Sequence, residues 1–326
     1  NQKRHPLYVQ QIWYRGLTCW SPNINIFRDP RWGRGHETYG EDPYLTSRMG
    51  VAFVKGMQGD HETYLKTIAT PKHFVVHSGP EQGRHSFDSI TSKKDLYETY
   101  LPAFKQVVQE AKAFSIMSAY NAVNGIPVSM NKELLQDILR NEFGFEGYVV
   151  SDCGAISDIY RHHKKAPSKA HAAAYSVQAG TDLNCGNTYK HLKKAYKKGL
   201  ISGADIDCSV TRLIEARFKL GMIGDVSDNP YDDISPDILC SKSHQELSLD
   251  ASRKSLVLLK NDGILPLSRD VKILVIGPNA DSIEILLGNY NGTPESTTTI
   301  LEGIRKLSYQ DVLYELGSEL TRQNKK

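Results

Sequence analysis

The chain has 326 residues, more than one hydrophobic core usually organises, and this length predicts about two domains. Hydrophobic residues make up 40% and charged residues 24%, which excludes the disordered, collagen-like and coiled-coil classes. The net charge is only +3 and neither sign forms long blocks, so we expect no nucleic-acid partner. No apolar run approaches the length of a membrane-spanning helix, which predicts a soluble protein without a membrane partner.

The cysteines predict no cross-links, and the two ends of the chain contain no targeting signal. The five cysteines are odd in number, widely spaced and lack a Cys-x-x-Cys pair: Cys19, Cys153, Cys185, Cys208 and Cys240. We therefore expect neither a disulfide framework nor a cysteine zinc site. The chain begins without an initiator Met or a signal region and stops just after a predicted strand, so both ends are interpreted as cut ends.

Short apolar runs alternate with amphipathic helices over the first two thirds of the chain. Strands are predicted at 17–20, 68–69 leading into 72–74, 114–117, 148–151 and 180–183. Helices with apolar residues every three or four positions are predicted at 101–111, 131–144 and 206–218. Strands separated by helices predict a parallel sheet, and the pattern leaves a barrel and a doubly wound sheet both open.

Residues 1–222 are predicted to form one α/β domain, shorter than the about 250 residues of a complete eight-fold barrel. A polar segment at 223–242, rich in Asp and Pro, predicts a linker. A helix at 243–254 and strands at 256–259 and 272–276 follow it. Residues 243–326 are therefore predicted to be the opening part of a second α/β domain.

The familiar cofactor motifs are missing, so we expect no cofactor and no metal. Gly33 and Gly35 begin a Gly-x-Gly, but Thr38 stands at the third glycine position. His73 and His77 are four residues apart but follow a strand, which does not favour a zinc pair on one helix face.

Polar residues at the carboxyl ends of the predicted strands are the candidates for chemistry. Asp152 follows the strand 148–151, where a carboxylate is either an active-site group or the N-cap of the next helix. Lys72 and His73 are either contacts at the rim of the sheet or a surface pair, and Tyr120 is either functional or structural. Arg34 lies in a loop rich in Arg and Trp, where the alternative is an ion-pair network that holds the loop.

The order of several motifs resembles glycoside hydrolase family 3. The motifs are Ser21–Arg34 (SPNINIFRDPRWGR), Glu37–Pro43 (ETYGEDP), Lys72-His73-Phe74, Ala119-Tyr120-Asn121, Val150-Ser151-Asp152, Lys260-Asn261, Leu265-Pro266-Leu267 and Ile276–Ala280 (IGPNA). The resemblance covers essentially the whole chain. It implies a partial (β/α)8 barrel followed by the start of an α/β sandwich, and metal-free retaining hydrolysis of β-glycosides from the non-reducing end.

The resemblance also implies roles for individual residues. Asp152 is expected to be the nucleophile that forms a covalent glycosyl-enzyme. Arg34, Lys72 and His73 are expected to hold sugar hydroxyls, with His73 as a neutral donor, and Tyr120 to hydrogen-bond the nucleophile. Trp20 and Trp32 are candidate platforms for a sugar face, although core packing is the simpler role for both.

The sugar is expected to be xylose, with glucose as the alternative. Cys153 stands where a Trp commonly follows the nucleophile in the β-glucosidase branch, and the segment His77–Glu81 resembles the β-xylosidase branch. Glu81 is expected to fill the space that a glucose hydroxymethyl group needs. The partner is thus a xylo-oligosaccharide or another β-glycoside; the pattern favours no oligomeric state.

Another branch uses a histidine oriented by an aspartate as its proton donor. His85 lies near that position, but Gly83 stands where the orienting aspartate is expected, so this role is not predicted. The general acid/base and one sugar-binding aspartate are expected outside the chain, which predicts poor hydrolysis of natural substrates by residues 1–326 alone. Family resemblance implies a periplasmic or secreted protein. From a different class, the alternative is a non-catalytic sugar-binding protein on the same scaffold.

Overall fold

The computed structural model describes residues 16–225, 227–287, 294 and 296–320. The chain divides into two compact units, Asn1–Ser235 and Pro236–Lys326, and the division falls inside the segment 223–242 that the sequence predicts as a linker. Within the described ranges, no helix has both the length and the apolarity that crossing a bilayer requires.

Short parallel strands in chain order form the centre of the first unit: β1 (Thr18–Cys19), β2 (Ile68–Ala69), β4 (Ser115–Ser118) and β7 (Tyr148–Ser151). Neighbouring segments are joined by parallel pairs or bridges, which are Thr18–Ile68, Asn23–Lys72, Phe74–Ser118, Ser115–Tyr148 and Val150–Leu183. The predicted strand at 180–183 is thus reduced to one bridge. Because all of these pairs are parallel, the carboxyl ends of the segments meet along one edge.

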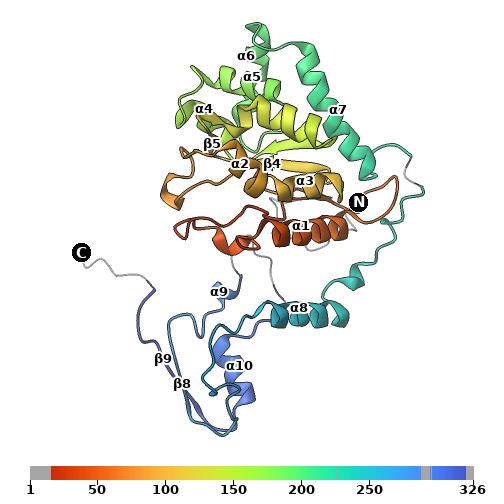
Figure 1. The fold of residues 1–326 in the computed structure, drawn as a ribbon. Helices are drawn as coiled ribbons and strands as arrows, with labels where there is room; N and C mark the ends of the chain where they lie inside the picture. The colour runs from red at the N-terminus through yellow and green to blue at the C-terminus, as the bar shows by residue number, and fades with distance from the viewer. Residues whose placement is uncertain (1–15, 226, 288–293, 295, 321–326) are drawn as a thin grey trace. The chain divides into compact units, whose positions relative to one another are not determined.

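Helices connect the parallel segments, as the sequence predicts for βαβ units. They are α1 (Pro43–Gln58), α2 (Lys93–Asp95), α3 (Pro102–Gln109), α4 (Ala155–Arg161), α5 (Lys169–Ala179), α6 (Leu192–Lys197) and α7 (Gly203–Lys219), with π-helical segments at Leu96–Tyr100 and Glu133–Glu142. α1 and α3 pack side by side (Figure 1). A small sheet of β3 (Asp88–Ser89), β5 (Ala122–Val123) and β6 (Ile126–Pro127) lies beyond the end of β4.

The apolar faces predicted from the sequence form the core of the first unit. Phe104 and Val107 of α3 and Leu135 and Leu139 of the segment Glu133–Glu142 are fully buried in one cluster with Phe74. Each such side chain contributes about 1.5–3 kcal/mol by its removal from water. This cluster packs the helices against the strands and thereby fixes the edge where the strands end.

The predicted helix at 131–144 has the expected signals at both ends. The Asn131 side-chain oxygen accepts the backbone N–H of Leu134 at 3.2 Å, which satisfies one donor of the first turn. Gly144 takes a φ of 75°, a left-handed conformation that glycine adopts without a side-chain clash, and the helix ends there.

The second unit contains α8 (Lys242–Ser255), β8 (Ile273–Ile276), α9 (Glu284–Leu287), α10 (Ile300–Leu307) and β9 (Val312–Glu315). β8 and β9 pair in parallel, and α10 begins with a capping box formed by Thr299 and Glu302. The predicted strand at 256–259 is wrong. These four residues have no regular structure and are 65–92% exposed, because no neighbouring strand pairs with them among the described residues.

Candidate active site

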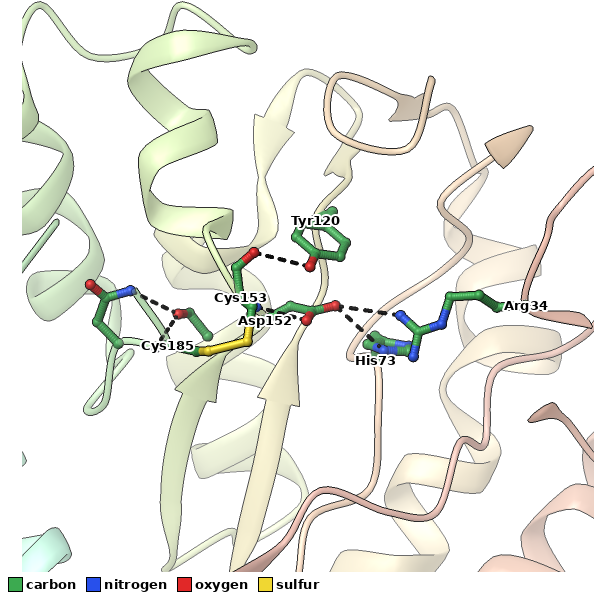
Figure 2. The surroundings of a disulfide bond; sticks show 8 residues. Arg34, His73, Tyr120, Asp152, Cys153 and Cys185 are labelled. Atoms are coloured by element: carbon green, nitrogen blue, oxygen red, sulfur yellow. Dashed lines mark hydrogen bonds and ion pairs between the residues drawn. A yellow bond between two sulfur atoms is a disulfide. The ribbon is translucent and has the colours of Figure 1, made fainter. Parts of the chain in front are cut away.

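Four of the predicted site residues lie around the carboxylate of Asp152. Asp152 directly follows β7, and its backbone N–H donates to the carbonyl oxygen of Ser118 at the end of β4. The Asp152 Oδ2 atom is 3.4 Å from Nε2 of His73 and 3.9 Å from Nη1 of Arg34. In Figure 2 both side chains point at this oxygen, and Cys153 lies on the other side of the Asp152 carboxylate.

Burial governs the ionisation of Asp152. The residue is 6% exposed, and its burial raises the pKa of the carboxyl group above the ordinary value of 3.8. The backbone N–H of Cys153, which donates to Oδ1 at 2.7 Å, and the positive charge of Arg34 oppose this rise. The alternative in which Asp152 caps the next helix is wrong, because α4 begins after Gly154 and Gly154 is its N-cap residue.

Arg34 is held in place by a carboxylate of its own loop. Its Nε and Nη2 atoms donate to the two carboxylate oxygens of Glu37 at 2.8 and 2.9 Å. This planar two-bond pair fixes the guanidinium plane, so that Nη1 faces Asp152. The ion-pair interpretation of this loop is therefore confirmed, and the same side chain lies beside Asp152; its binding of sugar hydroxyls stays a prediction.

Lys72 and His73 line the same edge as buried basic side chains, 8% and 3% exposed. Burial lowers the pKa of the Lys72 ammonium, and the nearby Arg34 charge lowers it further. Burial, together with the charges of Arg34 and Lys72, holds the pKa of His73 well below its ordinary value. His73 is therefore neutral at neutral pH.

Tyr120 lies on the Cys153 side of Asp152 (Figure 2). Its hydroxyl donates to the Cys153 carbonyl oxygen at 3.0 Å. Burial and the negative charge of Asp152 raise the pKa of the Tyr120 phenol, and the Tyr120 hydroxyl in turn lowers the pKa of Asp152. The hydroxyl therefore stays protonated and close to the carboxylate.

Among the described residues, neither a hydrogen bond nor an ion pair is found between Glu81 and Asp152. Glu81 lies in a 3-10 turn (Glu81–Gly83) and forms an ion pair with Arg84 at 2.8 Å. A side chain at Gly33 would approach Glu81 to about 3.0 Å, so Glu81 packs against the loop that carries Arg34. Its Oε2 atom is buried without a hydrogen-bond partner among the described residues.

A disulfide joins Cys153 to Cys185, which corrects the expectation of no disulfide framework. The two cysteines are 32 residues apart in the sequence, but they follow β7 and the adjacent Leu183 bridge, so their Cα atoms are 4.5 Å apart. The spacing of the two cysteines along the chain does not predict that their Cα atoms lie this close together. The bond lies directly beside the Asp152 carboxylate (Figure 2).

His85 has an orienting carboxylate, contrary to the expectation from the sequence. Its Nδ1 atom is 2.7 Å from Oδ2 of Asp158, a side chain of α4 that is 73 positions away along the chain. The residues next to His85 in the sequence do not reveal a partner that lies so far along the chain. The His85 ring also packs edge-on against Tyr120, with the ring centres 4.5 Å apart.

The two candidate platforms have different surroundings. Trp32 is buried and packs edge-on against His77, whereas Trp20 is half-buried and packs against the core beside Leu17 and Ile68. Across the described part of the chain, no three His, Cys, Asp or Glu side chains are placed to hold a metal ion together.

These features define an α/β protein with a buried carboxylate among basic and hydroxyl side chains. They meet at the carboxyl edge of the parallel strands, which is where α/β enzymes carry their active sites. Residues 11–216 match the glycosyl hydrolase family 3 N terminal domain, and residues 256–324 match the glycosyl hydrolase family 3 C-terminal domain. The chain belongs to glycosyl hydrolase family 3.

Curated relatives and solved structures agree with this assignment. The chain is 46% identical to a xylan 1,4-beta-xylosidase of Xylanibacter ruminicola and 45% identical to the probable beta-D-xylosidase 7 of Arabidopsis thaliana, over 98% and 93% of its length. It spans only 38% and 42% of the length of these relatives.

Two solved structures have similar folds. A GH3 exo-beta-xylosidase in complex with a xylobiose aziridine activity based probe superposes with a TM-score of 0.88 at 40% identity, covering 94% of this chain and 41% of that one. A beta-glucosidase from Listeria innocua in complex with glucose superposes with a TM-score of 0.82 at 34% identity, covering 94% and 43%.

Proposed function

We propose that the chain is part of a retaining, exo-acting β-glycosidase that releases xylose from the non-reducing ends of xylo-oligosaccharides, with Asp152 as the nucleophile. The observation that carries the proposal is the environment of the Asp152 Oδ2 atom. This atom is buried without a hydrogen-bond partner among the described residues and faces Arg34 and His73. A carboxylate oxygen with an unused lone pair in a polar, water-poor site is suited to attack on carbon.

The chemistry follows the two steps of a retaining mechanism. Oδ2 of Asp152 attacks the anomeric carbon as the bond from that carbon to the leaving oxygen breaks, and the leaving oxygen takes a proton from a general acid. Water then attacks the glycosyl ester, loses a proton to the same group acting as a base, and restores Asp152. The charges of Arg34 and Lys72 lower the pKa of Asp152 against the effect of its burial, and both side chains offer donors to sugar hydroxyls.

The relatives named as xylosidases support xylose as the sugar. The likeness to a beta-glucosidase in complex with glucose supports the alternative, a β-glucosidase of the same family. Glu81, packed against Gly33 of the Arg34 loop, is proposed to exclude the hydroxymethyl group of a hexose.

The first unit is proposed to be a partial (β/α)8 barrel, supported by parallel segments in chain order that alternate with helices. The second unit is proposed to be the opening part of an α/β sandwich. A periplasmic or secreted location is proposed, because disulfides such as Cys153–Cys185 persist in oxidising compartments.

The test is covalent labelling of the purified chain by 2-fluoro xyloside and 2-fluoro glucoside, each with an activated leaving group. Such a leaving group needs little proton donation, so the reaction reports on Asp152 by itself. Intact mass is expected to rise by one fluoroglycosyl group, and peptide mapping to place it on Asp152. The xyloside is expected to react faster, and Glu81→Ala to reduce that preference.

Two variants control this experiment. Asp152→Asn should abolish labelling, whereas Asp88→Asn, which alters a carboxylate that accepts the N–H of Gly125 in the small sheet, should retain it. A non-catalytic sugar-binding protein would remain unlabelled with both sugars while still binding them. Faster reaction with the glucoside would favour the β-glucosidase alternative.

A further inference from the structure

Backbone groups fix the orientation of the Asn25 side-chain amide. Its Nδ2 atom is 2.9 Å from the carbonyl oxygen of His73 and 3.3 Å from that of Val76, and carbonyl oxygens only accept. Its Oδ1 atom is 2.8 Å from the backbone N–H of His73, which only donates. The amide therefore cannot be turned around without three of these contacts becoming repulsive.

The same oxygen determines which nitrogen of His73 carries the proton. Oδ1 of Asn25 is 2.9 Å from Nδ1 of the His73 ring. Because an amide oxygen cannot donate, Nδ1 must donate to it. A neutral His73 is therefore the Nδ1–H tautomer, and its Nε2 atom carries only a lone pair.

That lone pair faces the carboxylate. His73 Nε2 is 3.4 Å from Asp152 Oδ2, and each atom is buried without a hydrogen-bond partner among the described residues. A neutral His73 and an ionised Asp152 thus present two acceptors to each other. A hydrogen-bond donor placed between or beside these two acceptor atoms removes the repulsion between their lone pairs.

We propose that Asn25 is a positioning residue that locks His73 as the Nδ1–H tautomer, so that Nε2 accepts a hydrogen bond from a hydroxyl group of the bound sugar. The inference rests on the proposed function for the identity of the ligand, whereas the tautomer stands on the Asn25 contacts alone. It reverses the role expected from the sequence, in which a neutral His73 donates to the sugar. A sugar hydroxyl that donates to Nε2 satisfies the lone pair and leaves Asp152 ionised for attack.

The tautomer is tested by NMR on the full chain with 15N-labelled histidine. The couplings from the two ring C–H protons to the two ring nitrogens distinguish the tautomers, and His73→Gln identifies the His73 signals among the eleven histidines. We expect Nδ1–H in the parent and a shift toward Nε2–H in Asn25→Ala. A parent with Nε2–H, or an unchanged tautomer in Asn25→Ala, would overturn the proposal.

Asn25→Asp provides a second variant if Asn25→Ala does not fold. A carboxylate beside Nδ1 still accepts its proton and adds a negative charge, so the titration of His73 should move to higher pH. Asn131→Ala is the matched control. This variant also removes a buried Asn that bonds to the backbone, but it lies at the start of a helix away from His73 and should leave the His73 signals unchanged.

The link to sugar binding is tested by labelling kinetics with the activated 2-fluoro xyloside. Asn25→Ala should raise the concentration for half-maximal rate several-fold to about tenfold, as for the loss of one hydrogen bond, with a smaller change in the maximal rate. An unchanged half-maximal concentration would overturn the accepting role of Nε2. If the parent is not labelled by either sugar but shows Nδ1–H, the proposed function fails and the tautomer stands.

Discussion

The Asp152 carboxylate is unfavourable for folding when it is ionised. Burial raises its pKa above 3.8 despite the N–H of Cys153, the charges of Arg34 and Lys72 and the hydroxyl of Tyr120. The folded chain thus binds this proton more tightly than the unfolded chain. The stability gained from the bound proton is fully present below about pH 3.8 and is lost as the pH rises through the raised pKa.

We therefore expect Asp152→Asn to unfold at a higher temperature than the parent at neutral pH. The difference should shrink as the pH falls and vanish below about 3.8, where both side chains are uncharged. Each kcal/mol shifts the melting temperature by roughly 2–4 °C for a unit of this size.

All three tryptophans precede residue 33, so intrinsic fluorescence reports on the first unit. Asp88→Asn is the control for the loss of one negative charge. A lower melting temperature for Asp152→Asn at neutral pH would contradict the pKa direction.

Strand ends explain how much of the site the sequence could predict. Asp152, His73 and Tyr120 follow apolar runs directly, so their meeting at one edge could be predicted from their positions once the segments are parallel. The tautomer of His73 could not, because Asn25 lies 48 positions away and acts through its amide. Asp158 was missed as the partner of His85 for the same reason: its contact crosses 73 positions.

At the scale of elements, the Cys153–Cys185 disulfide ties together the loops that follow two adjacent strand segments. Hydrogen bonds run beside it: the Gly154 N–H donates to the Cys185 carbonyl oxygen at 2.8 Å, and the Cys185 N–H donates to Ser151 Oγ at 3.1 Å. The Cys153 backbone also bonds Asp152 and Tyr120. The disulfide thus holds the backbone that places the carboxylate.

We expect the double variant Cys153→Ser/Cys185→Ser to lower the melting temperature of the first unit and to slow labelling of Asp152. Closing a loop of 32 residues contributes about 4 kcal/mol through the unfolded chain, or roughly 10 °C for a unit of this size. Labelling should slow because the N–H that orients Asp152 is less well fixed.

Reduction of the parent with a dithiol should reproduce both effects. Cys208→Ser is the matched control, since Cys208 is an exposed thiol outside the disulfide, and it should change neither quantity. Full stability and full labelling in the double variant would contradict this role of the disulfide.

Amphipathic periodicity predicted the long helices well, because the buried face of a helix is specified within a few turns. The helix predicted at 206–218, for example, is α7, which buries Ser209 and Ala216. The strand at 256–259 was predicted wrongly, since a strand depends on a neighbour that its own residues do not specify. β8 has such a neighbour in β9, 39 residues along the chain from Ile273 to Val312.

At the scale of the whole chain, contacts made by individual side chains explain where the first unit ends. Tyr231 closes the first unit: its hydroxyl accepts the N–H of His61 at 3.3 Å and its ring packs edge-on against the His61 ring. A side chain at Gly59 would clash with Tyr231, and the backbone oxygen of Asp225 accepts the Tyr64 hydroxyl. Such contacts hold the chain up to about Tyr231, although it has the composition of a linker.

We expect limited proteolysis with a protease of broad specificity to cut first between Ser235 and Lys242. This segment is largely exposed, and it begins where the first unit ends, so local opening needs little free energy there. Mass spectrometry should find two fragments that meet in this range.

Tyr231→Ala should move the first cut toward Asp225, because the segment loses its anchor on the loop Gly59–His61. Tyr309→Ala, in the second unit, is the control and should leave the first cut in place. A first cut between α1 and α7 in the parent would contradict the boundary.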